Sequence, residues 1–186
     1  MLYESVLDQR VFILRNVFDE EECHEWIEFA EDEGFETAPI SSGGGTLINP
    51  NVRDNLRCTM LNHEWAELVW ENILEYIPDM EDGRSPIGIN EFFRVYRYDE
   101  GHFMSTHQDF SYQRPDSDEC SVLTALIYLS DDFQGGETII YPGGEKELVI
   151  EPELGMILFF EHELWHEGNP VLSGQKYVLR TDVMYL

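Results

Sequence analysis

Residues 155–170 read Gly-Met-Ile-Leu-Phe-Phe-Glu-His-Glu-Leu-Trp-His-Glu-Gly-Asn-Pro, and this one segment matches two incompatible structural patterns. His162-Glu-Leu-Trp-His166 has the H-E-x-x-H spacing of zinc proteases, which needs a helix to place both imidazoles on one face. Met156–Phe160 instead forms a short apolar run that is typical of a buried strand. Because Gly168 and Pro170 follow closely, little helix fits here. We therefore predict strand and turn, which disfavours a zinc protease.

Short strands with turn signals continue on both sides of this segment. The separators are Gly135-Gly136, Pro142-Gly-Gly144 and Gly168-Asn-Pro170. Closely spaced strands of this kind predict a sandwich or barrel with helices packed outside. The expected strands of this half are 92–98, 121–129, 137–141, 148–151, 156–160 and 177–185.

The first half of the chain has a more helical pattern. Residues 11–18 predict a strand that leads to Asp19, a plausible N-cap, and a helix that ends before Gly34. A second helix is expected over 63–77, where Pro78 stops it. Between the two helices, residues 41–46 (Ser-Ser-Gly-Gly-Gly-Thr) predict a flexible loop. We thus expect a single domain, 1–186, with helical support over 1–86 and a β core over 87–186.

Composition limits the class of protein. A chain of 186 residues with 42% hydrophobic residues can bury a sizeable core. No apolar run reaches the ~20 residues that a membrane span needs, and the first residues lack the pattern of a secretory signal. Cys23, Cys58 and Cys120 lie far apart, which argues against a disulfide framework. These features predict a cytoplasmic protein that has no membrane partner.

The charge balance is strongly acidic. A net charge of −27 repels phosphates, so we expect no nucleic-acid partner. The same charge would attract a basic protein or a cationic substrate, or it would simply be a solvated surface. With 38 acidic residues against 11 basic ones, a lysine is rare enough to be informative; the two are Lys146 and Lys176.

A candidate metal site is formed by His107-Gln-Asp109 and His166. Residues i and i+2 of an extended segment point to the same side, so His107 and Asp109 can reach one ion. His166 lies 57 residues later, and a closed sheet could return it to the same place. Two histidines and one carboxylate on one face leave coordination positions open, as iron(II) oxygenases require.

Several ordered motifs over residues 88–186 together resemble the prolyl 4-hydroxylase family of iron(II)- and 2-oxoglutarate-dependent dioxygenases. They are Arg97-Tyr98, Gly101-His-Phe, His107-Gln-Asp109, Leu123–Leu129, Gly135-Gly-Glu-Thr138, Gly155–Phe160, His166–Val171 and Gly174-Gln-Lys176-Tyr177. The resemblance implies a mainly β fold with flanking helices, a double-stranded β-helix (a distorted jelly roll, cupin-like).

The resemblance also implies roles for individual residues. His107, Asp109 and His166 would be the catalytic metal ligands. Lys176, ten residues after His166, would pair with the distal carboxylate of 2-oxoglutarate. The residues expected near the co-substrate, where a hydroxyl can donate a hydrogen bond to a carboxylate, are Tyr98, Tyr128 and, with a weaker match, Thr138.

One position remains open at this stage. Lys176 and Arg180 share one face of a strand in the expected alternation. Arg180 could therefore be the carboxylate anchor instead, or it could form a buried pair with Asp182 or another acid. Arg53 and Arg57, in a region where the family has a mobile loop, could contact the substrate.

The resemblance implies an enzyme that uses Fe(II), 2-oxoglutarate and O2, with ascorbate as reductant, to hydroxylate an unactivated C–H bond. The favoured substrate is a prolyl residue in a peptide or protein. The alternatives are hydroxylation of a free amino acid or another small molecule, and a non-catalytic β-helix binding module. Neither the oligomeric state nor the identity of the substrate follows from the sequence.

Overall fold

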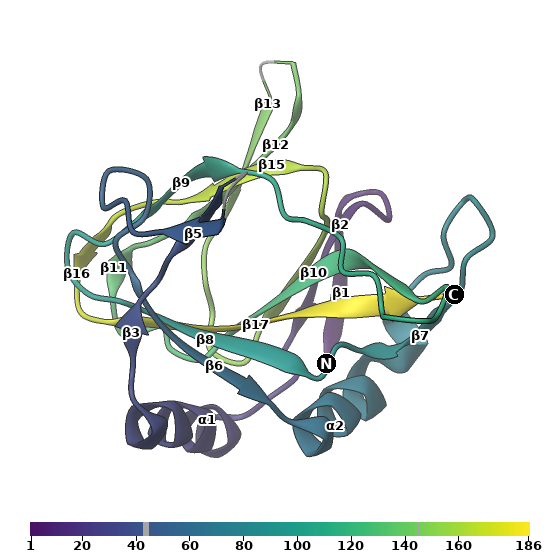
Figure 1. Ribbon diagram of the computed structural model, residues 1–186, viewed down its shortest axis with the longest axis horizontal. Helices are drawn as coiled ribbons and strands as arrows, with labels where there is room; N and C mark the ends of the chain where they lie inside the picture. Colours follow the sequence, from purple (N-terminus) through teal and green to yellow (C-terminus); the bar gives the residue numbers. More distant parts are fainter. Residues whose placement is uncertain (43–44, 145) are drawn as a thin grey trace.

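A large antiparallel sheet forms the centre of the computed structural model, which describes residues 1–42, 45–144 and 146–186 (Figure 1). Hydrogen bonding joins its strands in the spatial order β1 (Leu2–Leu7), β2 (Val11–Arg15), β14 (Ile157–Glu161), β10 (Cys120–Tyr128), β17 (Lys176–Tyr185), β8 (Phe92–Tyr98), β6 (Leu56–Leu61) and β3 (Glu36–Thr37). A further strand, β7 (Pro86–Ile89), pairs with the end of β17.

A smaller antiparallel sheet faces the large one and carries two of the three candidate metal ligands. Its strands lie in the order β13 (Lys146–Ile150), β12 (Thr138–Gly143), β15 (Trp165–Gly168) and β9 (Met104–His107). Two short pairs complete the barrel wall: β11 (Gln134–Gly135) with β16 (Val171–Ser173), and β4 (Ile40–Ser42) with β5 (Gly45–Leu47). Two facing antiparallel sheets confirm the predicted jelly-roll fold class.

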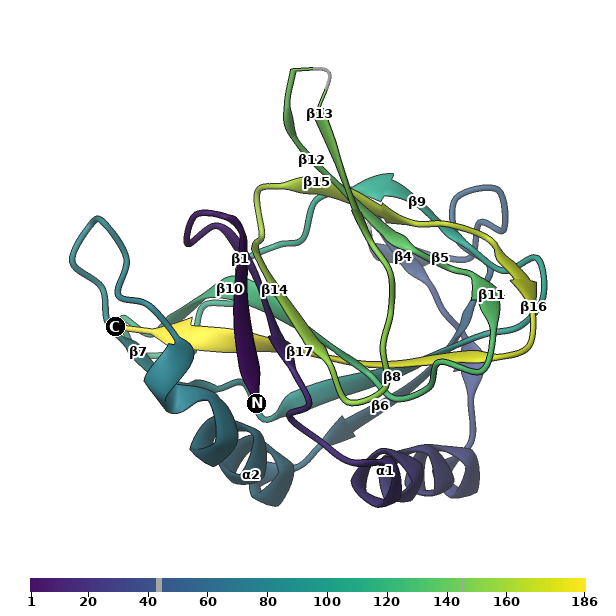
Figure 2. The same cartoon turned by 180° about the vertical axis from the view of Figure 1, so that it is seen from behind.

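Both helices lie on the side of the large sheet that faces away from the smaller sheet (Figures 1 and 2). α1 (Glu20–Glu33) starts at Asp19, whose carboxylate accepts a hydrogen bond from the Glu22 amide. The Glu22 side chain accepts from the Asp19 amide in return, which completes a capping box. The helix ends at Gly34, as predicted, and the left-handed φ of +92° there suits glycine.

The second helix is shorter than predicted. α2 (His63–Ile73) gives way to a 3-10 turn, η1 (Leu74–Tyr76), before Pro78. Its buried face consists of Ala66, Val69 and Ile73, whereas Leu68 is 37% exposed. The alanine lies inside because α2 packs closely against the core near Trp65 and Phe93.

Strand β17 separates two apolar clusters, because successive side chains point to opposite faces. Tyr177, Leu179 and Val183 pack in the cluster beneath the helices. Val178 packs in the cluster between the sheets, with Tyr128 and other side chains of the inner faces. The alternation therefore places Lys176, Arg180 and Asp182 on the same inner face as Val178.

The sheet does not divide at the expected boundary near residue 87. β2 lies between β1 and β14, and β6 pairs with β8 along its whole length. Segments from residues 1–86 are thus part of the same sheet as the later strands. Gly43 and Gly44 of the predicted loop lie outside the described residues, and the segments on either side pair as strands. In the described part of the chain, the helices are too short or too polar to span a bilayer.

Candidate metal and co-substrate site

Strand pairing brings the three candidate ligands together. β9 ends at His107, and β15 places His166 directly opposite it, so that the two ring centroids are 4.1 Å apart. The Asp109 carboxylate lies next to both rings. Its Oδ1 is 3.9 Å from His107 Nε2, and its Oδ2 is 3.7 Å from His166 Nε2. All three ligand atoms lie within 4.8 Å of one another, a spacing that a single ion could bridge.

The histidines present the nitrogens that a metal needs. Nδ1 of His107 lies 2.9 Å from the Ser105 carbonyl oxygen, and Nδ1 of His166 lies 3.0 Å from the Leu164 carbonyl oxygen. A carbonyl only accepts, so each Nδ1 carries the proton and each Nε2 offers a lone pair. Burial lowers the pKa of both imidazoles, that of His107 to about 4. This two-His, one-carboxylate donor set fits Fe(II).

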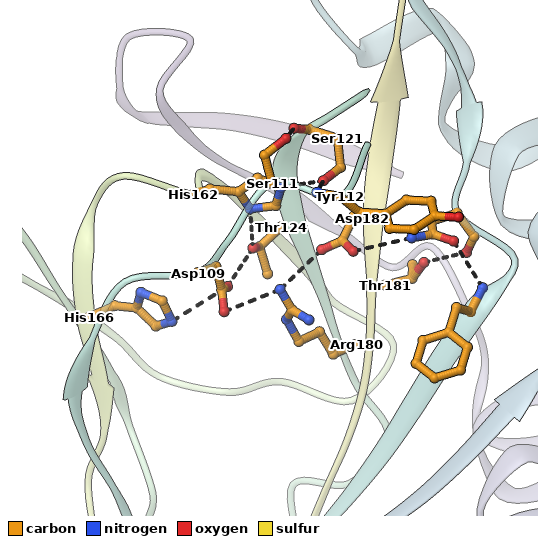
Figure 3. A network of polar contacts seen from close by, with 12 residues as sticks. Asp109, Ser111, Tyr112, Ser121, Thr124, His162, His166, Arg180, Thr181 and Asp182 are labelled. Carbon is orange, nitrogen blue, oxygen red and sulfur yellow. Dashed lines mark hydrogen bonds and ion pairs between the residues drawn. The ribbon is translucent and has the colours of Figure 1, made fainter. Parts of the chain in front are cut away.

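Asp109 is held by two neighbours that the ligand pattern did not reveal (Figure 3). Thr124 on β10 donates a hydrogen bond to Oδ2 at 2.6 Å, and Arg180 Nη2 lies 3.1 Å from Oδ1. Burial alone would raise the pKa of Asp109, but Arg180, the two histidines and the Thr124 hydrogen bond together outweigh it and keep the pKa well below its usual range. Asp109 is therefore a charged ligand with a fixed orientation.

His162 contacts Thr124 and Ser121 and is not placed as a metal ligand. Since Thr124 gives its proton to Asp109, its oxygen accepts from His162 Nδ1 at 2.9 Å. His162 Nε2 then accepts from Ser121 Oγ, also at 2.9 Å. The backbone here forms strand, turn and strand, not the helix that H-E-x-x-H requires. The zinc-protease interpretation therefore finds no support in the geometry.

Lys176 is buried at the first residue of β17, four residues before Arg180. Its Nζ donates to the Gly136 carbonyl at 2.6 Å and lies over the rings of Tyr98 and Tyr128, 5.4 and 5.3 Å from their centroids. The Tyr128 and Thr138 hydroxyls are 2.8 Å apart beside it. In the described residues no carboxylate pairs with this ammonium, and burial lowers its pKa to about 7. A buried cation flanked by hydroxyl donors fits the distal carboxylate of 2-oxoglutarate.

Arg180 occupies the other position that the sequence left open. Its Nη2 lies 3.1 Å from both Asp109 Oδ1 and Asp182 Oδ1 (Figure 3). These contacts match the alternative in which Arg180 forms a buried pair with Asp182 or another acid. A guanidinium that already binds two carboxylates is less suited to anchoring a third, which favours Lys176 as the anchor.

The remaining candidates divide between the site and the surface. Arg53 is buried with its guanidinium carbon 4.6 Å from the Tyr96 ring centroid, inside the barrel. Arg57 pairs with Glu36 outside it. Thr124 and Ser121 were missed, because a lone hydroxyl on a strand has no sequence signal until the sheet register is known.

A separate cleft of about 760 Å³ is lined by His162, Ser121 and Glu161, among others, and by none of the three ligands.

Comparison with known proteins agrees with this geometry. A family model described as the 2OG-Fe(II) oxygenase superfamily matches residues 93–181. A putative prolyl 4-hydroxylase of Acanthamoeba polyphaga mimivirus is 26% identical over 188 residues, covering 90% of this chain and 71% of that protein. Probable prolyl 4-hydroxylase 8 of Arabidopsis thaliana is 28% identical over 203 residues, covering 91% and 67%.

The fold is also shared with a solved structure, the Trichoplax adhaerens prolyl hydroxylase in complex with a hypoxia inducible factor peptide fragment. The TM-score is 0.72 at 17% identity, over 94% of this chain and 83% of that one. Fold, site and matches together support a prolyl 4-hydroxylase-like 2OG-Fe(II) oxygenase, and this similarity implies Fe(II), 2-oxoglutarate and O2. The curated relatives it resembles are prolyl 4-hydroxylases, which are oxidoreductases.

Proposed function

We propose that the protein hydroxylates prolyl residues in a peptide or protein, with Fe(II) held by His107, Asp109 and His166 and 2-oxoglutarate anchored by Lys176. One observation carries the proposal: a cluster of three metal-donor side chains shares the barrel with a buried lysine that has no carboxylate partner in the described residues. The choice of a prolyl residue rests on the names of the curated relatives. The choice of a peptide is supported by the solved complex of the Trichoplax protein.

The protein's own residues would bind and orient the reactants. Lys176, Tyr98, Tyr128 and Thr138 would receive the distal carboxylate, so that the keto acid end points along β17 toward the histidines. Thr124 and Arg180 hold the Asp109 carboxylate in place. Buried side chains such as Phe160, which contacts the His166 ring, exclude water. The bound metal, with O2 and 2-oxoglutarate, supplies the oxidation that replaces C–H by C–OH and releases succinate and carbon dioxide.

The test is turnover of 2-oxoglutarate to succinate by protein supplied with Fe(II), ascorbate and proline-containing peptides. We expect turnover to depend on the peptide, and the peptide to gain the mass of one oxygen atom on proline. Asp109→Ala should abolish the activity, because one of three ligands is lost. Glu163→Gln is the matched control: it removes an exposed acid of the H-E-x-x-H sequence and should have little effect.

A second pair of variants separates the two anchor candidates. Lys176→Ala should chiefly raise the KM for 2-oxoglutarate, whereas Arg180→Ala should weaken metal binding through Asp109. If Arg180→Ala raised that KM and Lys176→Ala did not, the assignment of the anchor would be wrong. Succinate formation with L-proline alone, and not with peptides, would favour the small-molecule alternative. Binding of peptides with no turnover would favour a non-catalytic module.

A further inference from the structure

Among the described residues, two arginines inside the barrel form no ion pair with an acid. Neither Arg53 nor Arg94 forms an ion pair with a carboxylate in the described parts of the chain. The other arginines each bind a carboxylate; the pairs are Arg10–Glu161, Arg15–Glu4, Arg57–Glu36, Arg84–Asp82, Arg97–Glu31, Arg114–Glu91 and Arg180–Asp109. In a chain with 38 acidic residues, two inward-facing cations without one are an exception that calls for a physical reason.

Arg94 lies beside the candidate metal site. It pairs in register with Arg180 across β8 and β17, and the alternation of β8 puts Arg94, Tyr96 and Tyr98 on one face. Its guanidinium lies 4.8 Å from the Phe92 ring centroid, and its Nη1 is buried without a hydrogen-bond partner. A buried N–H of a cation is costly unless something accepts from it.

Arg53 approaches the same face from the loop before β6. Its Nε donates to Asn55 Oδ1 at 2.7 Å, and its guanidinium lies over Tyr96, the neighbour of Arg94 on this face. Burial raises the pKa of Tyr96, yet Arg53, Arg180 and Arg94 together outweigh burial and lower it. The interior next to the metal ligands is therefore electropositive, in contrast to the acidic chain as a whole.

The charges near the site do not balance without a second anion. Arg53, Arg94 and Arg180 are three cations against the two anions Asp109 and Asp182, which leaves one positive charge, and Lys176 is assigned to 2-oxoglutarate. In the register of β17 and β8, Lys176 lies opposite Tyr98, and Arg180 lies opposite Arg94, four residues further along the strands. At about 3.3 Å per residue, Arg94 is roughly 13 Å from the lysine, too far to share the same carboxylate. Arg94 lies instead at the level of Arg180 and Asp109, where a substrate must approach the metal, and Arg53 lies over Tyr96, between the two levels.

We infer that Arg94, together with Arg53, binds a carboxylate of the substrate, so that the enzyme selects prolyl substrates with a carboxylate close to the target proline. This inference rests on the proposed function and adds the charge of the preferred substrate. A guanidinium binds a carboxylate through two parallel hydrogen bonds, which would satisfy the buried Nη1. The carboxylate has two possible sources: an acidic side chain next to the proline, or the α-carboxylate of a terminal or free proline.

Binding is measured on protein loaded with Mn(II) and 2-oxoglutarate without O2, by calorimetry. The probes are short acetylated and amidated peptides in which the proline is followed by Glu or by Gln, a peptide that ends in proline with a free or an amidated carboxyl, and L-proline. We expect the carboxylate forms to bind roughly tenfold to a hundredfold more tightly than their neutral partners. The Glu/Gln pair and the free/amidated pair identify the source of the carboxylate.

Variants at Arg94 locate the preference. Arg94→Gln should remove it, and Arg94→Lys should retain part of it. Arg94→Glu should favour a peptide with lysine after the proline, because the charge pair is reversed. Arg57→Gln is the matched control on the adjacent strand β6, where the arginine already binds Glu36, and it should keep the preference. Since Arg94 has no ion pair to lose, thermal unfolding of Arg94→Gln should match that of the parent protein.

The outcomes distinguish this inference from the proposed function. Equal affinity for charged and neutral partners, including no measurable binding of either, overturns the carboxylate site. So does a preference that persists in Arg94→Gln. Hydroxylation of neutral and acidic prolyl peptides at equal rates would leave the proposed function intact while removing the inference. If carboxylate probes bind through Arg94 but no prolyl substrate is hydroxylated, the carboxylate site stands and the choice of a prolyl substrate is wrong.

Discussion

At the scale of single residues, the site depends on proton positions that hydrogen bonds determine. The Ser105 and Leu164 carbonyls fix the tautomers of the two histidines, and Thr124 fixes one oxygen of Asp109. His162 has the opposite role: its own nitrogens are both engaged, by Thr124 and Ser121. Two histidines four residues apart therefore differ in function because of their partners, a difference that the local sequence does not show.

Lys176 leads to a prediction about protons. Because burial lowers the pKa of its ammonium to about 7, the free lysine loses its charge as the pH rises above that value. A bound carboxylate favours the charged form and raises the pKa again. Protein preloaded with Mn(II) should therefore take up a proton when it binds 2-oxoglutarate above pH 7, and the affinity should fall by up to about tenfold per pH unit.

Calorimetry in buffers of different ionisation enthalpy measures this uptake. Lys176→Arg is the control, since arginine keeps its charge throughout the range and should take up no proton. Proton uptake that is the same in both proteins would show that another group titrates. A parent protein whose affinity is flat between pH 6 and pH 9 would contradict the prediction.

At the scale of elements, β17 joins the parts of the site and the core. One face carries the lysine, the Arg180–Asp182 pair and Val178, while the other face packs beneath the helices. β14, which pairs with β10 and β2, is positioned through the turn before it. The Gly155 amide donates to the Tyr128 carbonyl, and the Gly155 carbonyl accepts from the amides of Val17 and Phe18.

Gly155 should therefore tolerate no side chain. Its φ is +69°, and a Cβ there would overlap the Phe18 carbonyl oxygen. We expect Gly155→Ala to lower the free energy of unfolding in urea by more than the ~1–3 kcal/mol of backbone strain alone. Gly83→Ala is the control: its φ is +91°, but open space surrounds the position, so only the strain should appear. Similar losses for both variants would mean that the Phe18 contact has little effect.

At the scale of the whole molecule, positive and negative charge are separated. The chain has a net charge of −27, yet four of its basic side chains, Lys176, Arg53, Arg94 and Arg180, face the interior of the barrel. Such a surplus of exposed carboxylates repels itself and weakens the folded state at low salt.

Salt should therefore stabilise the fold. Raising NaCl from ~20 mM to ~500 mM shortens the Debye length from roughly 20 Å to a few ångströms, so the Tm should rise by several degrees. Differential scanning calorimetry at both concentrations checks this. A Tm that falls with salt would show that the surface ion pairs, such as Arg97–Glu31, outweigh the repulsion.

The sequence alone determined the features that depend on local pattern. The alternation of apolar residues indicated most of the later strands, Asp19 and Gly34 marked both ends of α1, and the ordered motifs from Arg97 to Lys176 indicated the class of enzyme. Strands without such a pattern were missed, among them β6, β9 and β15.

Only the tertiary structure decided which residues meet. The pairing of β9 with β15 sets the distance between the two histidine ligands, and the pairing of β10 with β14 and β17 brings Thr124 and Arg180 to Asp109. Residues 155–170 show the same division. Their apolar run predicted a strand, but the role of each histidine depends on sheet register, because a hydrogen-bond partner that lies tens of residues away leaves no trace in the local sequence.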